Sequence, residues 1–163
     1  MSVSKYVDHL LVLPEDDANT KVLNGFVLHD TINSRLVHVL PEAGGWRHVL
    51  DEFEEIHVKE LRIYPKRRIL MLIDFDRRED RRQAVEVRIP ADVRGRVFLI
   101  GSWSEPEKLR IALGRSLEEI GTSLAEDCFR DTNTTWSHAL LEHNTAELVR
   151  LREQVRPFLF EPT

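Results

Sequence analysis

The sequence predicts an α/β protein with a doubly wound, mostly parallel four-stranded sheet, flanking helices and a C-terminal helical extension. Short apolar runs typical of buried strands alternate with segments whose apolar residues recur every three or four positions, as on one face of a helix. Such alternation favours a parallel sheet, because each crossover helix returns the chain to the same end of the sheet. We therefore expect an α/β domain over residues 1–113 and helices packed on it over residues 114–163.

The apolar run at residues 69–73 predicts the central strand of this sheet. Five successive apolar residues fit a strand that helices cover on both faces. Asp74 and Asp76 follow directly, and both carboxylates point to the same side if the strand continues that far. In open α/β sheets, ligands bind at the carboxyl ends of the strands. The sequence therefore places the candidate site at the end of this strand.

Two further strands are predicted before the central one. Residues 9–13 are apolar except for His9 and end at an acidic turn, after which helical spacing continues to about residue 29. Residues 36–40 form the next apolar run, and helical spacing resumes over residues 46–56 after a Gly-Gly turn. Residues 61–64 are either a short extra strand or the lead-in to the central one.

The second half of the chain supplies one more strand. Residues 77–90 predict a polar helix or loop, residues 96–100 a fourth strand, and residues 104–113 a helix with proline in its first turn. The tail from residue 116 onward contains no convincing strand. Its two apolar stripes predict two helices, the second of which ends before Pro157.

The composition is that of an ordinary globular protein. The 163 residues are 42% hydrophobic and 31% charged, and the formal net charge of −5 argues against a generally basic surface that coats nucleic acid. The single cysteine, Cys128, excludes an intramolecular disulfide, and its place on an apolar stripe predicts a buried, inert thiol. No apolar run approaches the roughly 18 residues of a membrane span, and no signal-peptide pattern is seen. We expect a cytoplasmic protein without membrane contact.

Acidic residues follow three of the predicted strands. Because parallel strands end at one edge of the sheet, carboxylates that are distant in sequence can converge there on a metal ion. Mg²⁺ prefers a few carboxylates together with water and a substrate phosphate, and Mn²⁺ accepts the same ligands. The candidate ligands are Glu15, Asp74 and Asp76, with Asp16, Asp17 and Glu105 as further candidates. Helix capping is the alternative for each residue alone, but it does not require two aspartates at the end of a buried strand.

Two other groups are candidate anion contacts. Gly44 and Gly45 stand between a predicted strand and a helix, where N–H groups could face an anion, although a tight turn is the simpler explanation. Four arginines follow the acidic pair and could hold a nucleic-acid backbone, or could instead form a solvated helix face paired with nearby acids. These are Arg77, Arg78, Arg81 and Arg82.

The acidic motifs resemble those of the TOPRIM (topoisomerase–primase) domain family, which includes small stand-alone nucleases. That family is similar in having a glutamate at the end of its first strand, matched by Glu15 in VLPEDDAN. It also has an aspartate-x-aspartate at the end of a later hydrophobic strand, matched by Asp74 and Asp76 in LIDFD. The family's glycine after the second strand is matched by Gly44 or Gly45.

The resemblance, which covers roughly residues 8–112, implies a Mg²⁺- or Mn²⁺-dependent, nuclease-like protein that cleaves phosphodiesters in nucleic acid. Asp74 and Asp76 would hold the metal, and Glu15 would be a further ligand or the general acid/base. Nuclease-type members often carry a second glutamate four residues after the first, where this chain has Asn19. A second metal would then depend on one of the further acidic candidates.

Two alternatives stay open. The first is a phosphoacceptor domain of the response-regulator kind, in which Asp74 would be phosphorylated and Ser102 would be the hydroxyl residue after the next strand. Such a domain needs a fifth strand that ends in lysine, which the sequence does not predict, and it has no need of Asp76. The second is a TOPRIM-like module that binds nucleic acid or a partner subunit without chemistry. Carboxylates of Glu15 and Asp74 within about 6 Å of each other could share a cation, which makes their separation the most informative distance.

Overall fold

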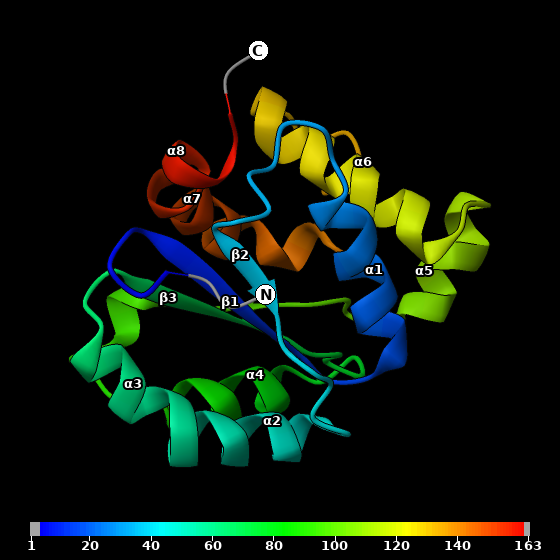
Figure 1. Ribbon diagram of the computed structural model, residues 1–163. Helices are drawn as coiled ribbons and strands as arrows, with labels where there is room; N and C mark the ends of the chain where they lie inside the picture. The colour runs from blue at the N-terminus through cyan, green and yellow to red at the C-terminus, as the bar shows by residue number, and fades with distance from the viewer. Residues whose placement is uncertain (1–3, 162–163) are drawn as a thin grey trace.

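A computed structural model of the chain, which describes residues 4–161, shows four parallel strands between two layers of helices (Figure 1). The strand order is β2-β1-β3-β4, so β1 and β3 lie at the centre. The strands are β1 (His9–Pro14), β2 (Val37–Val39), β3 (Arg67–Leu72) and β4 (Val97–Ile100). The prediction of an α/β protein with a four-stranded parallel sheet is confirmed.

Three helices cover the lower face of the sheet in Figure 1. They are α2 (Trp46–Glu52), α3 (Val58–Ile63) and α4 (Glu79–Glu86). A π-helical segment, Phe53–His57, joins α2 to α3, so the predicted helix extends well beyond residue 56. Residues 61–63 form the end of α3 and Tyr64 is its C-cap, so the short extra strand considered for residues 61–64 is not formed. Odd-numbered strand residues such as Ile69 and Met71 form the core on this side.

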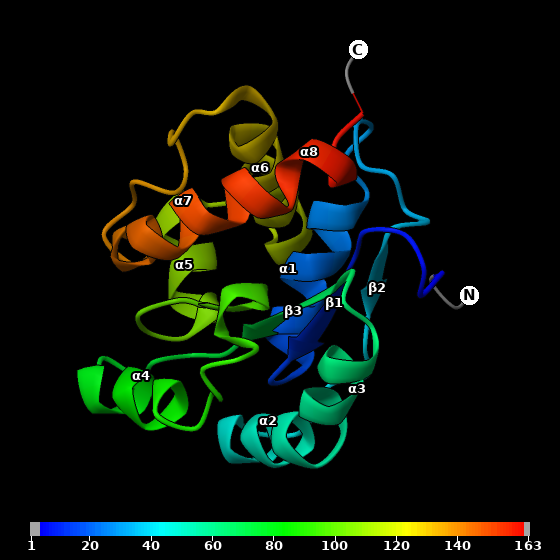
Figure 2. The same ribbon diagram turned by 90° about the vertical axis from the view of Figure 1, so that its left-hand side faces the viewer.

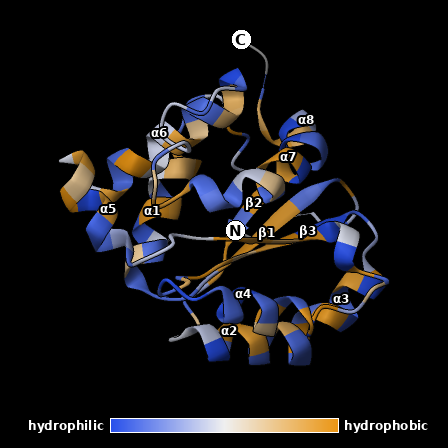
Figure 3. Ribbon diagram, turned by 180° about the vertical axis from the view of Figure 1, so that it is seen from behind, coloured by the Kyte–Doolittle hydropathy of each residue, from blue (hydrophilic) through white to orange (hydrophobic). Residues whose placement is uncertain are grey.

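The upper layer contains the remaining helices. They are α1 (Asp17–Val27), α5 (Pro106–Leu113), α6 (Leu117–Arg130), α7 (Thr145–Gln154) and α8 (Arg156–Leu159). Figure 2 shows α1, α6, α7 and α8 on the same side of the sheet, and Figure 3 shows that the strands are largely hydrophobic. Strand residues such as Leu70 and Phe98 share one apolar cluster with Ile120, Leu124 and Leu151 of the tail. The C-terminal helices thus pack directly on the sheet.

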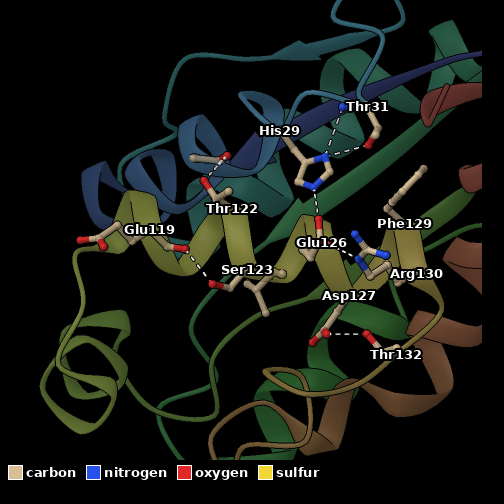
Figure 4. Close-up of polar contacts among 12 residues, drawn as sticks. His29, Thr31, Glu119, Thr122, Ser123, Glu126, Asp127, Phe129, Arg130 and Thr132 are labelled. Atoms are coloured by element: carbon tan, nitrogen blue, oxygen red, sulfur yellow. Dashed lines mark hydrogen bonds and ion pairs between the residues drawn. The ribbon is translucent and has the colours of Figure 1, made fainter. Parts of the chain in front are cut away.

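Helix α6 packs closely against α1 because both carry a glycine at the contact. A Cβ added at Gly25 would lie 1.8 Å from a backbone oxygen of α6, and one added at Gly121 would lie 1.9 Å from a backbone oxygen of α1. The Thr122 hydroxyl donates to the Gly25 carbonyl at 3.0 Å. At the end of α1 the His29 ring pairs with the Glu126 carboxylate (Figure 4). Backbone contact and polar pairing together fix this interface.

The outer edge of β4 is satisfied by side chains from the start of α7. The Leu99 N–H donates to Glu147 Oε2 at 2.8 Å, and the Gly101 N–H donates to Asn144 Oδ1 at 3.2 Å. Asn144 Nδ2 donates in return to the Gly101 carbonyl at 3.0 Å. These bonds occupy the edge along which a fifth strand would pair, and the structure of residues 4–161 shows four strands in all. None of its helices is long and apolar enough to cross a membrane.

Candidate metal centre

Glu15 is held at the carboxyl end of the sheet by backbone groups on two sides. Its N–H donates to the Leu72 carbonyl at 2.9 Å, which places it next to the end of β3. Its Oε2 accepts from the Asp74 N–H at 2.7 Å. The carboxylate is therefore anchored beside Asp74 by the chain itself and has one oxygen outside this bond.

Asp16 is the N-cap residue of α1. Its Oδ1 accepts from the Asn19 N–H at 3.0 Å, as expected for a helix start, and also from Asn19 Nδ2 at 2.9 Å. The same Nδ2 donates to Asp74 Oδ1 at 3.2 Å. Asn19 thus ties the start of α1 to the end of β3 and orients two carboxylates at once.

Glu15, Asp16 and Asp74 converge on one point. Each offers a carboxylate oxygen, and the three oxygens all lie within 4.8 Å of one another. Separations of this size allow three oxygens to contact the same divalent cation. The distance that the sequence singled out, between Glu15 and Asp74, therefore falls in the range of a shared cation.

Burial and mutual repulsion raise the pKa values of these carboxyl groups. The pKa of Asp74 is raised to about 7, first by burial and next by the charge of Glu15, while the bond from Asn19 opposes the shift. The pKa of Glu15 is also raised, chiefly by burial, although the Asp74 N–H lowers it. Two buried like charges are stabilised by a cation between them, so this set of carboxylate oxygens is suited to a divalent metal ion.

Asp76, predicted to lie beside Asp74, is not part of this cluster. Strand β3 ends at Leu72, and Asp76 and Arg77 have left-handed backbones with φ of 51° and 56°. The turn breaks the alternation of side chains on which the prediction depended. The Asp76 side chain is 66% exposed, and its Oδ2 lies 3.7 Å from Arg81 Nη2.

The other acidic candidates also stay outside the cluster. Asp17 is 71% exposed and pairs with Lys21 at 3.2 Å, one helical turn along α1. Glu105 is the exposed N-cap of α5, and its charge contributes only a minor increase to the pKa of Asp74. Of the three further candidates, the structure brings only Asp16 into the site.

The predicted arginine group divides into two pairs. Arg81 turns inward, where Nη1 donates to the Asp74 carbonyl at 2.7 Å and the guanidinium lies 4.9 Å from the centre of the Trp46 ring. Arg82 lies 4.5 Å from the centre of the Phe75 ring and is 12% exposed.

The other pair faces solvent. Arg78 is exposed and pairs with Asp80 at 2.7 Å, and Arg77 is exposed at the turn itself. Arg81 therefore supports the carboxylate cluster, whereas Arg77 and Arg78 lie on the solvated surface, where Arg78 forms two hydrogen bonds with Asp80.

Gly44 and Gly45 support Glu15 through their backbone. Their N–H groups donate to the Glu15 carbonyl at 2.9 and 3.1 Å. Their φ values of 90° and 140° lie in the region that favours glycine, so the pair is required by this turn. Both N–H groups are engaged within the chain, and the structure therefore gives the predicted anion site no support.

Sequence reasoning did not find the roles of Asn19 and Trp46. The signal for Asn19 was its position three residues after the Asp16 cap, which places its side chain over the helix start. Nothing local predicts that Trp46 stacks on Arg81, because the two are brought together only by the packing of α2 beside α4. Comparison with models of protein families, with curated proteins and with solved structures finds no match to the chain. The carboxylate cluster at the sheet edge is therefore the feature from which a function can be inferred.

Proposed function

We propose that this protein is a Mg²⁺- or Mn²⁺-dependent, nuclease-like enzyme that cleaves phosphodiester bonds in nucleic acid. The observation that carries the proposal is the convergence of Glu15, Asp16 and Asp74 within 4.8 Å at the carboxyl edge of the sheet. These three residues would hold the metal. The bound metal would supply charge neutralisation at the phosphate and activate a water.

The residues of this chain prepare that chemistry by fixing the carboxylates before substrate arrives. Asn19 and the Asp74 N–H hold the three side chains in one arrangement. Arg81, which donates to the Asp74 carbonyl, fixes the backbone at the same point. Preorganised charge is the main source of catalysis in phosphoryl transfer, so rigid carboxylates suit the proposal.

The exposed turn beside the cluster provides the contact with substrate. Arg77 and Arg78 are exposed there, next to a negatively charged centre that alone would repel nucleic acid. Asp76 lies in the same exposed turn and outside the carboxylate cluster, and in this proposal it contacts the substrate. The proposed role of Asp76 therefore differs from the ligand role that the TOPRIM resemblance implies.

The test is a cleavage assay on single- and double-stranded DNA and RNA with Mg²⁺ or Mn²⁺, combined with calorimetric titration of the metal alone. We expect Glu15→Gln and Asp74→Asn to abolish both metal binding and cleavage. Asp17→Asn, an exposed acid in the same segment, is the matched control and should leave both unchanged. Metal binding without cleavage of any of these substrates would contradict the proposed nuclease activity and favour a binding module that works with a partner.

A phosphoacceptor domain is the second candidate, and one observation favours it. The register pairs Leu72 with Ile100, and the Phe75 N–H donates to the Ser102 carbonyl, so Ser102 lies beside Asp74 across the sheet edge. The side chains of α7 along β4 weigh against it, because they fill the place of the fifth strand. Incubation with acetyl phosphate followed by mass spectrometry decides the matter. A phosphoryl adduct on Asp74 would establish this candidate in place of the nuclease.

A further inference from the structure

Most arginines in residues 4–161 are already engaged within the chain. Their side chains pair with acids, as Arg78 does with Asp80, or donate to backbone carbonyls or a hydroxyl. The exceptions, which have neither an ion pair nor a side-chain hydrogen bond, are exposed: Arg35, Arg47 and Arg77. A guanidinium without an acidic neighbour is not neutralised locally, and it gives up no internal contact when it binds an anion.

Arg47 lies beside the carboxylate cluster, on the side of β1 and β2. It is the second residue of α2, which begins directly after the glycine turn that donates to the Glu15 carbonyl. Its guanidinium lies 5.3 Å from the centre of the Trp46 ring. Arg81, which donates to the Asp74 carbonyl, lies 4.9 Å from the centre of the same ring. The Trp46 ring therefore connects Arg47 to the backbone of the cluster.

Arg77 lies on the other side of the cluster, in the turn after β3. Its backbone is left-handed with φ of 56°, and the preceding Asp76 has φ of 51°. Residues other than glycine adopt this conformation only where surrounding contacts hold it. Here the Arg77 N–H donates to the Trp103 carbonyl at 2.6 Å. The next N–H of the turn, that of Arg78, donates to the Phe75 carbonyl at 2.9 Å. The Arg77 side chain therefore leaves a well-held point of the backbone.

The metal centre lies between these two arginines at the carboxyl edge of the sheet. In the strand order β2-β1-β3-β4, the turn before α2 connects β2 to the end of β1, and the turn that carries Arg77 bonds to the segment after β4. Arg35 precedes β2 and therefore lies at the opposite, amino edge. A nucleic-acid backbone along the carboxyl edge would meet one unpaired arginine on each side of the metal centre.

We propose that Arg47 and Arg77 bind two phosphates of a nucleic-acid backbone, one on each side of the metal centre. The two contacts rest on the proposed function, because they presuppose that the substrate is nucleic acid, and they add the path of the substrate strand. Arginine suits them, since its planar guanidinium forms charged, paired hydrogen bonds with phosphate oxygens. Contacts to phosphate position the strand and carry no base sequence, so binding is independent of sequence.

The test measures binding of a short fluorescein-labelled single strand and of the matching duplex to the full chain with Mg²⁺, by fluorescence anisotropy, together with cleavage of both probes. We expect Arg47→Gln and Arg77→Gln each to weaken binding about fivefold and to raise KM without changing kcat. Each should also reduce the slope of log affinity against log salt concentration by about 0.7 for the single strand or about 0.9 for the duplex. The probe that shows these losses is the form of nucleic acid that the site binds.

Arg35→Gln is the matched control, because it removes another exposed and unpaired arginine from the opposite edge of the sheet. It should bind and cleave like the unaltered chain. Arg77→Lys keeps the charge at the turn and should retain more affinity than Arg77→Gln.

The outcomes separate this inference from the proposed nuclease activity. Cleavage by the unaltered chain, with Arg47→Gln and Arg77→Gln behaving like Arg35→Gln, would overturn the phosphate contacts and leave the nuclease standing. Binding that depends on Arg47 and Arg77 without any cleavage would uphold the contacts and contradict the nuclease. Failure of the unaltered chain to bind either probe would overturn both.

Discussion

The two ends of helix α1 make opposite kinds of contact: one holds like charges together, and the other packs closely against a neighbouring helix. At the N-terminal end, Asp16 and Asn19 meet Glu15 and Asp74 in a cluster where like charges are held together and pKa values are raised. At the C-terminal half, Gly25 brings the backbone against α6 in a contact with no space to spare. The N-terminal end holds carboxylates that repel one another. The C-terminal half packs against α6, and this packing stabilises the fold that keeps the carboxylates together. Binding sites commonly draw on stability provided elsewhere in this way.

The packing end is the more sensitive to substitution, and Gly121→Ala is expected to have the largest effect. The added Cβ would lie 1.9 Å from the Val22 carbonyl oxygen, which no rotamer change can relieve. We expect a loss of about 3 kcal/mol in the free energy of unfolding, measured by urea denaturation. Gly95→Ala is the control, since its Cβ would meet nothing within 4 Å. A Gly121 variant as stable as this control would contradict the close contact.

A substitution at the carboxylate end should stabilise the protein, because Asp74→Asn removes a buried charge that Glu15 repels. A folded pKa of about 7, raised above the ordinary 3.8, means that the folded state binds more protons than the unfolded chain between these values. The stability linked to Asp74 is therefore fully present below about pH 4 and is lost as pH rises through 7. At pH 8 without metal, the variant should be more stable by about 2 kcal/mol in urea denaturation. Asp76→Asn, at an exposed position, serves as the control and should change little.

Mg²⁺ should reverse the order of stability of the unaltered chain and Asp74→Asn. If Glu15, Asp16 and Asp74 bind Mg²⁺ as we propose, the ion should stabilise the unaltered chain and leave Asp74→Asn unaffected. The measurement is the melting temperature of both proteins at pH 8 with increasing Mg²⁺ concentration. Equal shifts in melting temperature for the two proteins would contradict the assignment of Asp74 to the metal centre.

His143 gives a smaller pH effect of the opposite sign near the same edge. Its pKa is lowered to about 4 by burial and then by the charge of Arg82. The ring centre lies 5.2 Å from that of Phe75, the residue before Asp76. Its contribution to stability is present above the ordinary pKa of 6.5 and is lost as pH falls toward 4. In His143→Gln the decrease in unfolding free energy from pH 7 to pH 5 should be smaller by about 1 kcal/mol. An unchanged pH profile would show that the ring is accessible to protons in the folded protein.

The smallest effect is expected from filling a buried apolar cavity between the sheet and the helices α1, α6, α7 and α8. Cys128→Met would occupy part of the 60 Å³ void and should stabilise the fold by about 1 kcal/mol. Burial raises the pKa of the Cys128 thiol, so the substitution removes no reactive group at neutral pH. Affinity for Mg²⁺ should not change, because the cavity and the metal centre are separate. A destabilised variant would show that the wall cannot accept the longer side chain.

Much of the fold could be predicted from the sequence because its signals are local. Apolar runs identified all four strands to within a residue or two, and the Gly44-Gly45 turn marked the start of α2. Glu15 and Asp74 could be paired because parallel strands end at the same edge of a sheet. Asp76 could not be excluded in the same way, since alternation holds only while the strand lasts, and β3 ends at Leu72.

The sequence by itself determined the class of fold and the chemical identity of the carboxylates at the sheet edge. Tertiary structure decided which of them meet. Asp16 joined the cluster because Asn19 ties the start of α1 to Asp74. Arg81 turned inward because α4 packs beside Trp46. Such choices depend on contacts between residues far apart in the chain, whereas strands and turns depend on neighbours, and only neighbours can be read from sequence spacing.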